Sequence, residues 1–272
     1  MNIIVLVKQV PNTTHIKLDP KTGNLIREGL ESIMNPDDLH ALEAGIRIKE
    51  ETGARVTAVS MGPPQAVDVL TQAMGMGADK AILLSDRAFS GADTWATSYT
   101  LSKAIEKINE YDLILCGHQA IDGDTAQIGP QIADWLDIAQ ATYVKEIESM
   151  NKNEAENEII VKRRLEDGFE RVACKMPVLL TIISELNEPR YPHMGQLISA
   201  CEQKAPIQVW NAADIGAKAI EVGLEGSNTH VIKTFTPNFK RQNELLEGST
   251  QEVVSDLIGR LKKSDTSISH RL

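Results

Sequence analysis

The feature that most constrains the fold is a regular alternation, over the first half of the chain, of short apolar runs with longer segments of helical periodicity. The first run, Asn2 to Lys8, is almost entirely Ile, Val and Leu, which is typical of a strand covered by helices on both faces. Strands and helices that alternate at this length join through right-handed crossovers into an open sheet. The sequence therefore predicts an α/β fold with a doubly wound parallel sheet, whose ligands bind at the carboxyl ends of the strands.

The expected elements follow from this pattern. Helix starts are indicated at Asn35-Pro36-Asp37-Asp38 and at Gly62-Pro63-Pro64, because Asn can accept from free N–H groups and Pro suits a first turn. A turn-rich stretch at 19–24 predicts a hairpin excursion after the first strand. The predicted strands are 2–8, 55–60, 81–84 and 111–116; the predicted helices begin at 35 and 62 and span 94–108 and 125–135.

The pattern changes after residue 142. Four strand-like runs, 143–149, 158–165, 170–175 and 178–183, are joined by short polar turns and predict an antiparallel extension. Beyond residue 186 the chain is irregular until a last helix at about 250–263, and a long, loosely structured tail usually contacts something else. We therefore divide the chain into an α/β domain, 1–186, and a loop with a C-terminal arm, 187–272.

Composition excludes several classes of function. The 272 residues include 28 Lys and Arg against 38 Asp and Glu, a formal charge of −10, and no basic stripe interleaves with aromatic residues. Nucleic acid is therefore excluded as a partner. No run approaches the roughly 18 apolar residues of a membrane span and no cationic leader precedes the first strand, which predicts no membrane insertion and a cytoplasmic location. The three cysteines lack CxxC spacing, which argues against structural zinc.

The densest polar signal spans residues 116–127. It lies where the fourth predicted strand ends and a helix begins, which is a ligand position in this architecture. Gly117 and Gly123 allow a close backbone approach, and Asp124 or Thr125 can cap a helix whose free N–H groups suit a phosphate. An ordinary capped loop is the alternative explanation of these local features.

Other chemistries find less support. The acidic pair in this loop resembles the start of a calcium-binding loop, but Ala133 stands where the last ligand belongs. No Gly-rich ATPase motif occurs, and Gly75-Met76-Gly77 follows a predicted helix instead of a strand, unlike a dinucleotide fingerprint. Cys116 lies in an apolar run without a nucleophile arrangement, so we expect a buried thiol and assign no catalytic residue and no metal site. For His118, a hydrogen-bonding loop residue and a residue near ligand remain equally open.

Six short segments, spread over almost the whole chain, are specific in combination. They are Val5-Leu6-Val7-Lys8-Gln9-Val10-Pro11, Met34-Asn35-Pro36-Asp37-Asp38, Ala58-Val59-Ser60-Met61-Gly62-Pro63, Ala73-Met74-Gly75-Met76-Gly77-Ala78-Asp79, Gln119-Ala120-Ile121-Asp122 and Asn187-Glu188-Pro189-Arg190-Tyr191. These segments occur in the order seen in electron-transfer flavoprotein beta subunits, which the chain therefore resembles.

The resemblance implies a fold and a set of partners. Beta subunits of this family look like doubly wound nucleotide-binding domains, similar to adenine-nucleotide hydrolases, that hold AMP or FAD. Each pairs with an alpha subunit, and the heterodimer carries electrons through flavin to or from acyl-CoA dehydrogenases and related enzymes. By this resemblance, 1–186 is the nucleotide-binding domain and 187–272 binds partners, with the C-terminal arm wrapping the alpha subunit.

The resemblance also implies two sets of residues. The docking loop would contact a partner dehydrogenase through an apolar anchor, here Met194, within the set Arg190, Tyr191, Met194, Leu197 and Ile198. The nucleotide site would comprise Leu6, Asn35, Pro36, Asp37, Asp38, Met61, Gly117, His118, Gln119, Ala120, Ile121, Asp122, Gly123, Asp124, Thr125, Ala126, Gln127 and Ile128.

Three segments, 122–130, Trp210 and 231–237, are similar to the electron-bifurcating branch of the family. In that branch electrons from NADH enter through FAD in the beta subunit; one passes to ferredoxin or flavodoxin and the other to the FAD of the alpha subunit. The resemblance therefore implies FAD as cofactor and NADH as transient donor. Two alternatives stay open: a non-bifurcating carrier with structural AMP, and a free-standing adenine-nucleotide sensor, against which the long tail argues.

Overall fold

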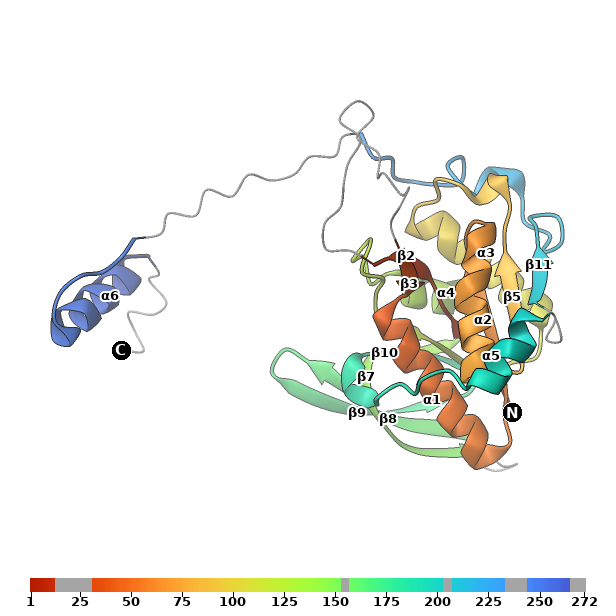
Figure 1. Ribbon diagram of the computed structural model, residues 1–272, viewed down its shortest axis with the longest axis horizontal. Helices are drawn as coiled ribbons and strands as arrows, with labels where there is room; N and C mark the ends of the chain where they lie inside the picture. The colour runs from red at the N-terminus through yellow and green to blue at the C-terminus, as the bar shows by residue number, and fades with distance from the viewer. Residues whose placement is uncertain (13–30, 153–156, 203–206, 233–243, 265–272) are drawn as a thin grey trace. The chain divides into compact units, whose positions relative to one another are not determined.

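The computed structural model describes residues 1–12, 31–152, 157–202, 207–232 and 244–264. The chain divides into two compact units, Met1–Ile232 and Lys233–Leu272. The second unit contains helix α6, Thr250–Ser264, and the first contains the other elements (Figure 1). The predicted hairpin at 19–24 lies outside the described residues, and the functional division at residue 186 stays a prediction.

A nine-stranded sheet forms the centre of the first unit, in the order β11-β5-β4-β1-β6-β10-β7-β8-β9. Neighbours from β11 to β7 are parallel, whereas β7, β8 and β9 are antiparallel. The predicted doubly wound parallel sheet with an antiparallel extension is confirmed. The strands are β1 Asn2–Leu6, β4 Arg55–Met61, β5 Lys80–Leu84, β6 Leu113–Gly117, β7 Ala139–Lys152, β8 Asn157–Leu165, β9 Gly168–Lys175, β10 Val178–Ile182 and β11 Ile207–Trp210; β2 Gln9–Pro11 and β3 Ser32–Met34 form a separate antiparallel pair.

One strand of the extension differs from the sequence prediction. An antiparallel arrangement of all four runs after residue 142 is wrong for the last, because β10 lies between β6 and β7 and is parallel to both. Leu179, for example, pairs with Ile114 on one side and Gln140 on the other. All five residues of β10 are buried, as a strand inside a parallel sheet requires. Its sequence is apolar except for Thr181, unlike the mixed sequences of β8 and β9, and this is typical of a strand buried on both faces.

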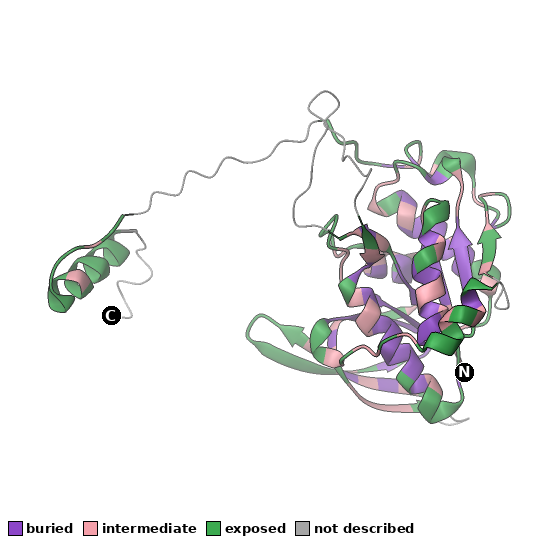
Figure 2. Cartoon of the chain, viewed as in Figure 1, coloured by how far each residue is buried: buried purple, intermediate pink, exposed green. Residues whose placement is uncertain are grey.

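Helices cover both faces of the sheet, and the sheet lies between two apolar cores. Side chains of Ile3 and Val5 join the core under α1 and α2, whereas Ile4 and Leu6 join the core under α3 and α4, following the two-residue period of a strand. Buried residues concentrate in the central strands and on the inner sides of these helices (Figure 2). The helices are α1 Pro36–Thr52, α2 Val67–Met76, α3 Thr94–Ile108, α4 Ile128–Trp135 and α5 Met194–Cys201, with short 3-10 turns η1 Pro64–Ala66, η2 Arg87–Phe89, η3 Ser184–Leu186 and η4 Ala219–Glu221. Among the described helices, none has the length and apolar character to cross a bilayer.

Candidate functional site

Three neighbouring strands end at the edge of the sheet where the predicted nucleotide residues gather. β1 lies between β4 and β6, so that Leu6, Met61 and Gly117 end adjacent strands. Leu6 is buried, whereas Met61 is half-buried at the rim of the core under α3 and α4. The amino terminus of α1 lies at the same edge, because its first turn bonds to the residues that follow β1 and end β6. The edge therefore combines apolar walls with the start of a helix.

Asp38, in the first turn of α1, joins two of these strand ends. Its Oδ2 accepts a hydrogen bond from the Lys8 backbone N–H at 2.8 Å, and its Oδ1 accepts one from the Gly117 N–H at 3.0 Å. Burial raises the pKa of this carboxyl to about 7, against the opposing effect of hydrogen bonds from Asn35, Lys8 and Gly117. The side chain thus fixes the spacing of β1 and β6 at the site while holding a proton near neutral pH.

We expect Asp38 to titrate near pH 7 in the folded protein. Because its pKa is raised from 3.8 to about 7, the folded state binds a proton that the unfolded state has released, so this contribution to stability is full below about pH 4 and is lost as the pH rises through 7. Between pH 5 and 8 the free energy of unfolding should fall by roughly 2–3 kcal/mol from this group. Infrared difference spectra should show a protonated carboxyl band at pH 5.5 that disappears by pH 8.5 and is missing in Asp38→Asn; a band that is equal in both proteins would contradict the assignment.

Asn35 fastens the loop that follows β6 to the start of α1. The sequence predicts that its side chain caps the helix, and this is wrong: no side-chain cap is formed. Instead the amide Nδ2 donates to the Gln119 carbonyl oxygen at 2.8 Å, and Oδ1 accepts from the Ile121 N–H at 3.0 Å. The Asn35 side chain is fully buried, whereas Gln119 is half-buried and Ile121 is exposed, so the two bonds are partly shielded from water.

Two close contacts between a basic side chain and a carboxylate border the loop. Lys8 Nζ lies 2.6 Å and 2.8 Å from the two carboxylate oxygens of Asp122, and His118 Nδ1 lies 2.6 Å from Asp37 Oδ2. The ring centre of His118 is 5.1 Å from that of Tyr143, whose φ of +57° is unusual for a bulky residue. Sequence reasoning did not select Lys8 or Tyr143. Lys8 is the charged residue that ends the first apolar run, 2–8, which is the signal that could have identified it.

The helix after the loop begins three residues later than predicted. α4 starts at Ile128 and the residue before it, Gln127, makes no side-chain cap, so the proposal that Asp124 or Thr125 caps it is wrong. Asp124 and Ala126 have φ values of +48° and +53°, left-handed conformations that end any helical path before residue 127. The first N–H groups of α4 lack partners within the helix and, without a cap, can face an anion.

The two glycines of the loop have different roles. A Cβ atom on Gly117 would lie 2.5 Å from Asp38 Oδ1 and 2.7 Å from Asp37 Cβ. A Cβ atom on Gly123 would meet no described atom within 4 Å, and the φ of Gly123 is outside the left-handed region. Glycine is therefore required at 117 by close packing, whereas the described residues impose no such requirement at 123.

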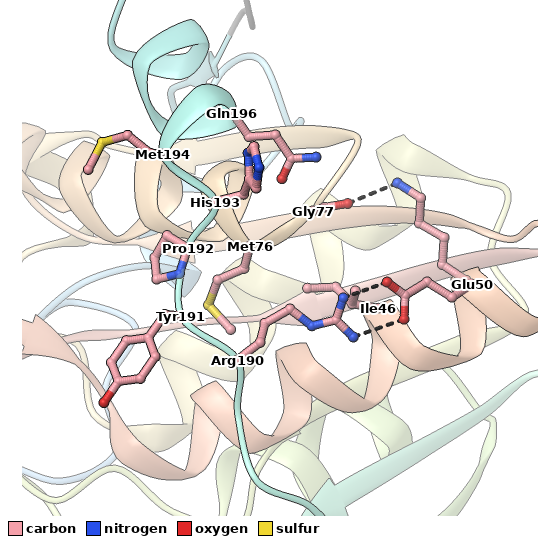
Figure 3. A pocket seen from close by; sticks show the side chains of 11 residues that line it. Ile46, Glu50, Met76, Gly77, Arg190, Tyr191, Pro192, His193, Met194 and Gln196 are labelled. Carbon is pink, nitrogen blue, oxygen red and sulfur yellow. Dashed lines mark hydrogen bonds and ion pairs between the residues drawn. The ribbon is translucent and has the colours of Figure 1, made fainter.

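The predicted docking residues lie together on a segment that crosses α1 and α2. Tyr191, Met194 and Ile198 are 95%, 67% and 48% exposed, whereas Arg190 and Leu197 contact the helices below. A surface pocket of about 640 Å³ lies beside them (Figure 3). In this view the Tyr191 and Met194 side chains point away from the ion pair of Arg190 with Glu50. The three exposed members of the set are large apolar side chains within one short segment, 191–198.

Two further sequence expectations can be placed. Cys116 is buried, and burial raises the pKa of its thiol, as expected for a thiol inside a strand. Trp210 is half-buried beside Lys107, whose Nζ lies 4.2 Å from the ring centre. Residues 233–237 of the last similar segment lie outside the described residues. The described residues hold no group of three or more His, Cys, Asp or Glu side chains placed for a metal ion.

An open, doubly wound sheet with a polar loop and a helix start meeting at its carboxyl edge defines the class of α/β proteins that hold ligands at this edge. The family model of the electron transfer flavoprotein domain matches residues 22–215. The chain belongs to the electron transfer flavoprotein family, and within it to the beta subunits, as its sequence motifs indicate.

The relatives cover nearly the whole chain. The electron transfer flavoprotein subunit beta of Thermoanaerobacterium thermosaccharolyticum is 52% identical over 261 residues, which cover 96% of this chain and 98% of that protein. Subunit CarD of the caffeyl-CoA reductase-Etf complex of Acetobacterium woodii is 49% identical, covering 97% of this chain and 98% of its own. The acryloyl-CoA reductase electron transfer subunit gamma of Anaerotignum propionicum is 41% identical, covering 96% and 98%.

Proposed function

We propose that this chain is the beta subunit of an electron-bifurcating flavoprotein, that it holds FAD at the carboxyl edge of its sheet, and that NADH is the electron donor. The observation that carries the proposal is the fastening of the loop 117–128 to the start of α1 through Asn35 and Asp38. This fastening presents the loop and the uncapped start of α4 at the edge where doubly wound proteins bind nucleotides.

The residues at this edge fit an adenine nucleotide. The uncapped amino terminus of α4 suits a diphosphate, because its first N–H groups and the helix dipole both favour negative charge. Leu6 and Met61 offer apolar contacts to an adenine ring, and the carboxylates of the loop can accept hydrogen bonds from ribose hydroxyls. Lys8 neutralises one of these carboxylates, Asp122, which limits repulsion of the phosphates.

Bound here, FAD would supply the redox chemistry, and the protein would supply binding, orientation and electrostatics. Asp38 and Asn35 would keep the loop in place, and the contact of His118 with Asp37 would join the end of β6 to the first turn of α1. AMP would use the same adenine and phosphate contacts, which makes a carrier with structural AMP the alternative function of this edge.

The proposal includes its partners. Two relatives are named as parts of caffeyl-CoA and acryloyl-CoA reductase complexes, which supports an acyl-CoA reductase or dehydrogenase as one acceptor here. We propose a ferredoxin or flavodoxin as the second acceptor, an alpha subunit as the permanent partner, and the cytoplasm as location. Helix α6 supports an alpha-subunit contact, because Val254, Leu257, Ile258 and Leu261 form an exposed apolar face at helical spacing.

Anaerobic mixing of the purified heterodimer with NADH tests this function. If the chain holds FAD that accepts electrons from NADH, NADH alone should bleach the flavin absorbance within the time of enzyme turnover. A heterodimer that an acyl-CoA dehydrogenase reduces but NADH does not would contradict the bifurcating function and support the carrier with AMP.

We expect Met194→Ala to slow electron transfer to the acyl-CoA partner about tenfold, because an exposed thioether can fill an irregular pocket on that partner. The concentration of partner at half-maximal rate should rise while the nucleotide content stays unchanged. Stopped-flow reduction kinetics measure the first, and acid extraction followed by chromatography measures the second. A variant that loses stability but transfers electrons at the wild-type rate once folded would instead assign Met194 to internal packing.

A further inference from the structure

The docking segment, residues 187–201, is bonded to the helices beneath it. Its backbone and side-chain contacts begin before the exposed residues and continue to the start of α5. The bonds are Asn187 Nδ2 to the His40 carbonyl oxygen at 2.9 Å, Arg47 Nη2 to the Glu188 carbonyl oxygen at 3.1 Å, and the His193 N–H to the Gly75 carbonyl oxygen at 2.8 Å. The segment is therefore anchored on both α1 and α2.

Arg190 makes the strongest of these contacts. Its Nε donates to Glu43 Oε2 at 2.8 Å and its Nη2 donates to Glu50 Oε2 at 2.9 Å, so one guanidinium joins two carboxylates that lie two turns apart on α1. Its backbone N–H also donates to Glu43 Oε2, at 3.2 Å. Figure 3 shows the Arg190 fork bonded to the Glu50 carboxylate in the lining of the pocket. A fork held by several charge-assisted bonds has little rotational freedom.

Glu43 is a buried partner. Its side chain is only 2% exposed; burial raises its pKa, but hydrogen bonds from Arg190 and Arg47 outweigh that effect and hold the pKa below its ordinary value. A buried carboxylate that stays ionised needs cations beside it. Glu43 therefore favours the position of the Arg190 guanidinium against α1.

The far end of the segment is fixed by close packing. A Cβ atom on Gly75 would lie 3.1 Å from both Leu197 Cδ1 and Pro192 Cβ. The segment therefore packs closely against α2 at Gly75, where a larger side chain would be crowded. Tyr191, Met194 and Ile198 project from a framework fixed at both ends. Arg190 and Leu197 belong to that framework and the other three residues to its outer surface.

We propose that Arg190 is a positioning residue for partner docking, which preforms the surface of Tyr191, Met194 and Ile198 and acts through Met194. The inference rests on the proposed function, since that surface is taken to receive an acyl-CoA reductase. A surface that is already ordered loses less conformational freedom on binding, so the clamp lowers the cost of association without adding a contact across the interface.

Variants of the intact heterodimer test the inference by two readouts. In Arg190→Gln, backbone amides of 191–201 should exchange hydrogen about tenfold faster, and the concentration of its own acyl-CoA reductase at half-maximal rate should rise about tenfold at unchanged maximal rate. Arg190→Gln leaves the buried Glu43 carboxylate with Arg47 as its cation. If this single variant folds poorly, the double variant Glu43→Gln/Arg190→Gln, which removes the buried charge as well, is measured in its place. Arg190→Lys, which keeps one charge but cannot span both carboxylates, should fall between the wild type and Arg190→Gln.

A double-mutant cycle separates positioning from direct contact. If Arg190 acts through Met194, Arg190→Gln should change the half-saturating concentration little in the Met194→Ala background. An equal effect in both backgrounds, or amide exchange as slow as in the wild type, would overturn the inference while leaving the docking function intact. If Met194→Ala alone leaves the half-saturating concentration unchanged, the docking function itself fails, and the role of Arg190 in it fails with it.

Discussion

Gly117→Val is expected to remove most of the nucleotide from the beta-subunit site and to lower the stability of the complex by about 3 kcal/mol. The added Cβ would lie 2.5 Å from Asp38 Oδ1 and 2.9 Å from the Asp37 backbone carbon, distances at which the helix start has to move. A shift there breaks the bond from the Gly117 N–H to Asp38 and displaces the loop that follows. Acid extraction gives the nucleotide content and thermal unfolding of the complex gives the stability.

Gly123→Val is the matched control for this result. It adds the same side chain six residues further along, where the Cβ meets no described atom within 4 Å and the φ is not left-handed. Its stability should stay within about 0.5 kcal/mol of the wild type. If Gly123→Val empties the site and Gly117→Val does not, then the ligand packs against residue 123 and the fastening at 117 is not what shapes the site.

Asn35→Ala is expected to have the second-largest effect, a loss of about 3 kcal/mol in stability together with weaker nucleotide retention. The substitution removes a fully buried side chain and leaves the Gln119 carbonyl oxygen and the Ile121 N–H without their partner. A polar group that loses its partner away from water costs about 1–3 kcal/mol. The loop, freed at its centre, should sample other conformations. Differential scanning fluorimetry and nucleotide retention after gel filtration measure the two effects.

Asn12→Ala is the control for Asn35→Ala. Asn12 also follows a strand near this end of the chain, but it is exposed and its Nδ2 bonds to the exposed Glu31 at 3.0 Å. Its removal should change neither stability nor nucleotide retention measurably, because an exposed amide exchanges its partner for water. If both asparagine variants lost the same stability and the same nucleotide retention, the hydrogen bonds of Asn35 would not be what holds the loop in place.

The main architecture could be predicted from the sequence because its signals are local. Asn2–Leu6, Arg55–Met61 and Thr94–Ile108 follow apolar runs and helical periodicity closely, and the order of strands and helices then limits the topology. The meeting of Leu6, the α1 start and Gly117 at one edge was predictable for the same reason, since parallel strands place their carboxyl ends together.

The remaining features depend on contacts between residues distant in sequence. Asn35 is a residue type favoured at helix caps, but the partners of its side chain lie 84 and 86 residues away. The sequence does not show whether an Asn side chain will cap its own helix or bond to a distant loop. The late start of α4 arises from left-handed turns at two non-glycine residues, Asp124 and Ala126, which propensity does not predict. The insertion of β10 likewise depends on which strands it meets.

The central claim, that the carboxyl edge of this chain holds FAD, is tested most directly by counting nucleotides in the purified wild-type heterodimer. Acid extraction followed by chromatography separates FAD from AMP, and the protein concentration then gives the number of each per heterodimer. We predict two FAD and no AMP per heterodimer. One FAD with one AMP would contradict it and leave the chain as the beta subunit of a non-bifurcating electron carrier.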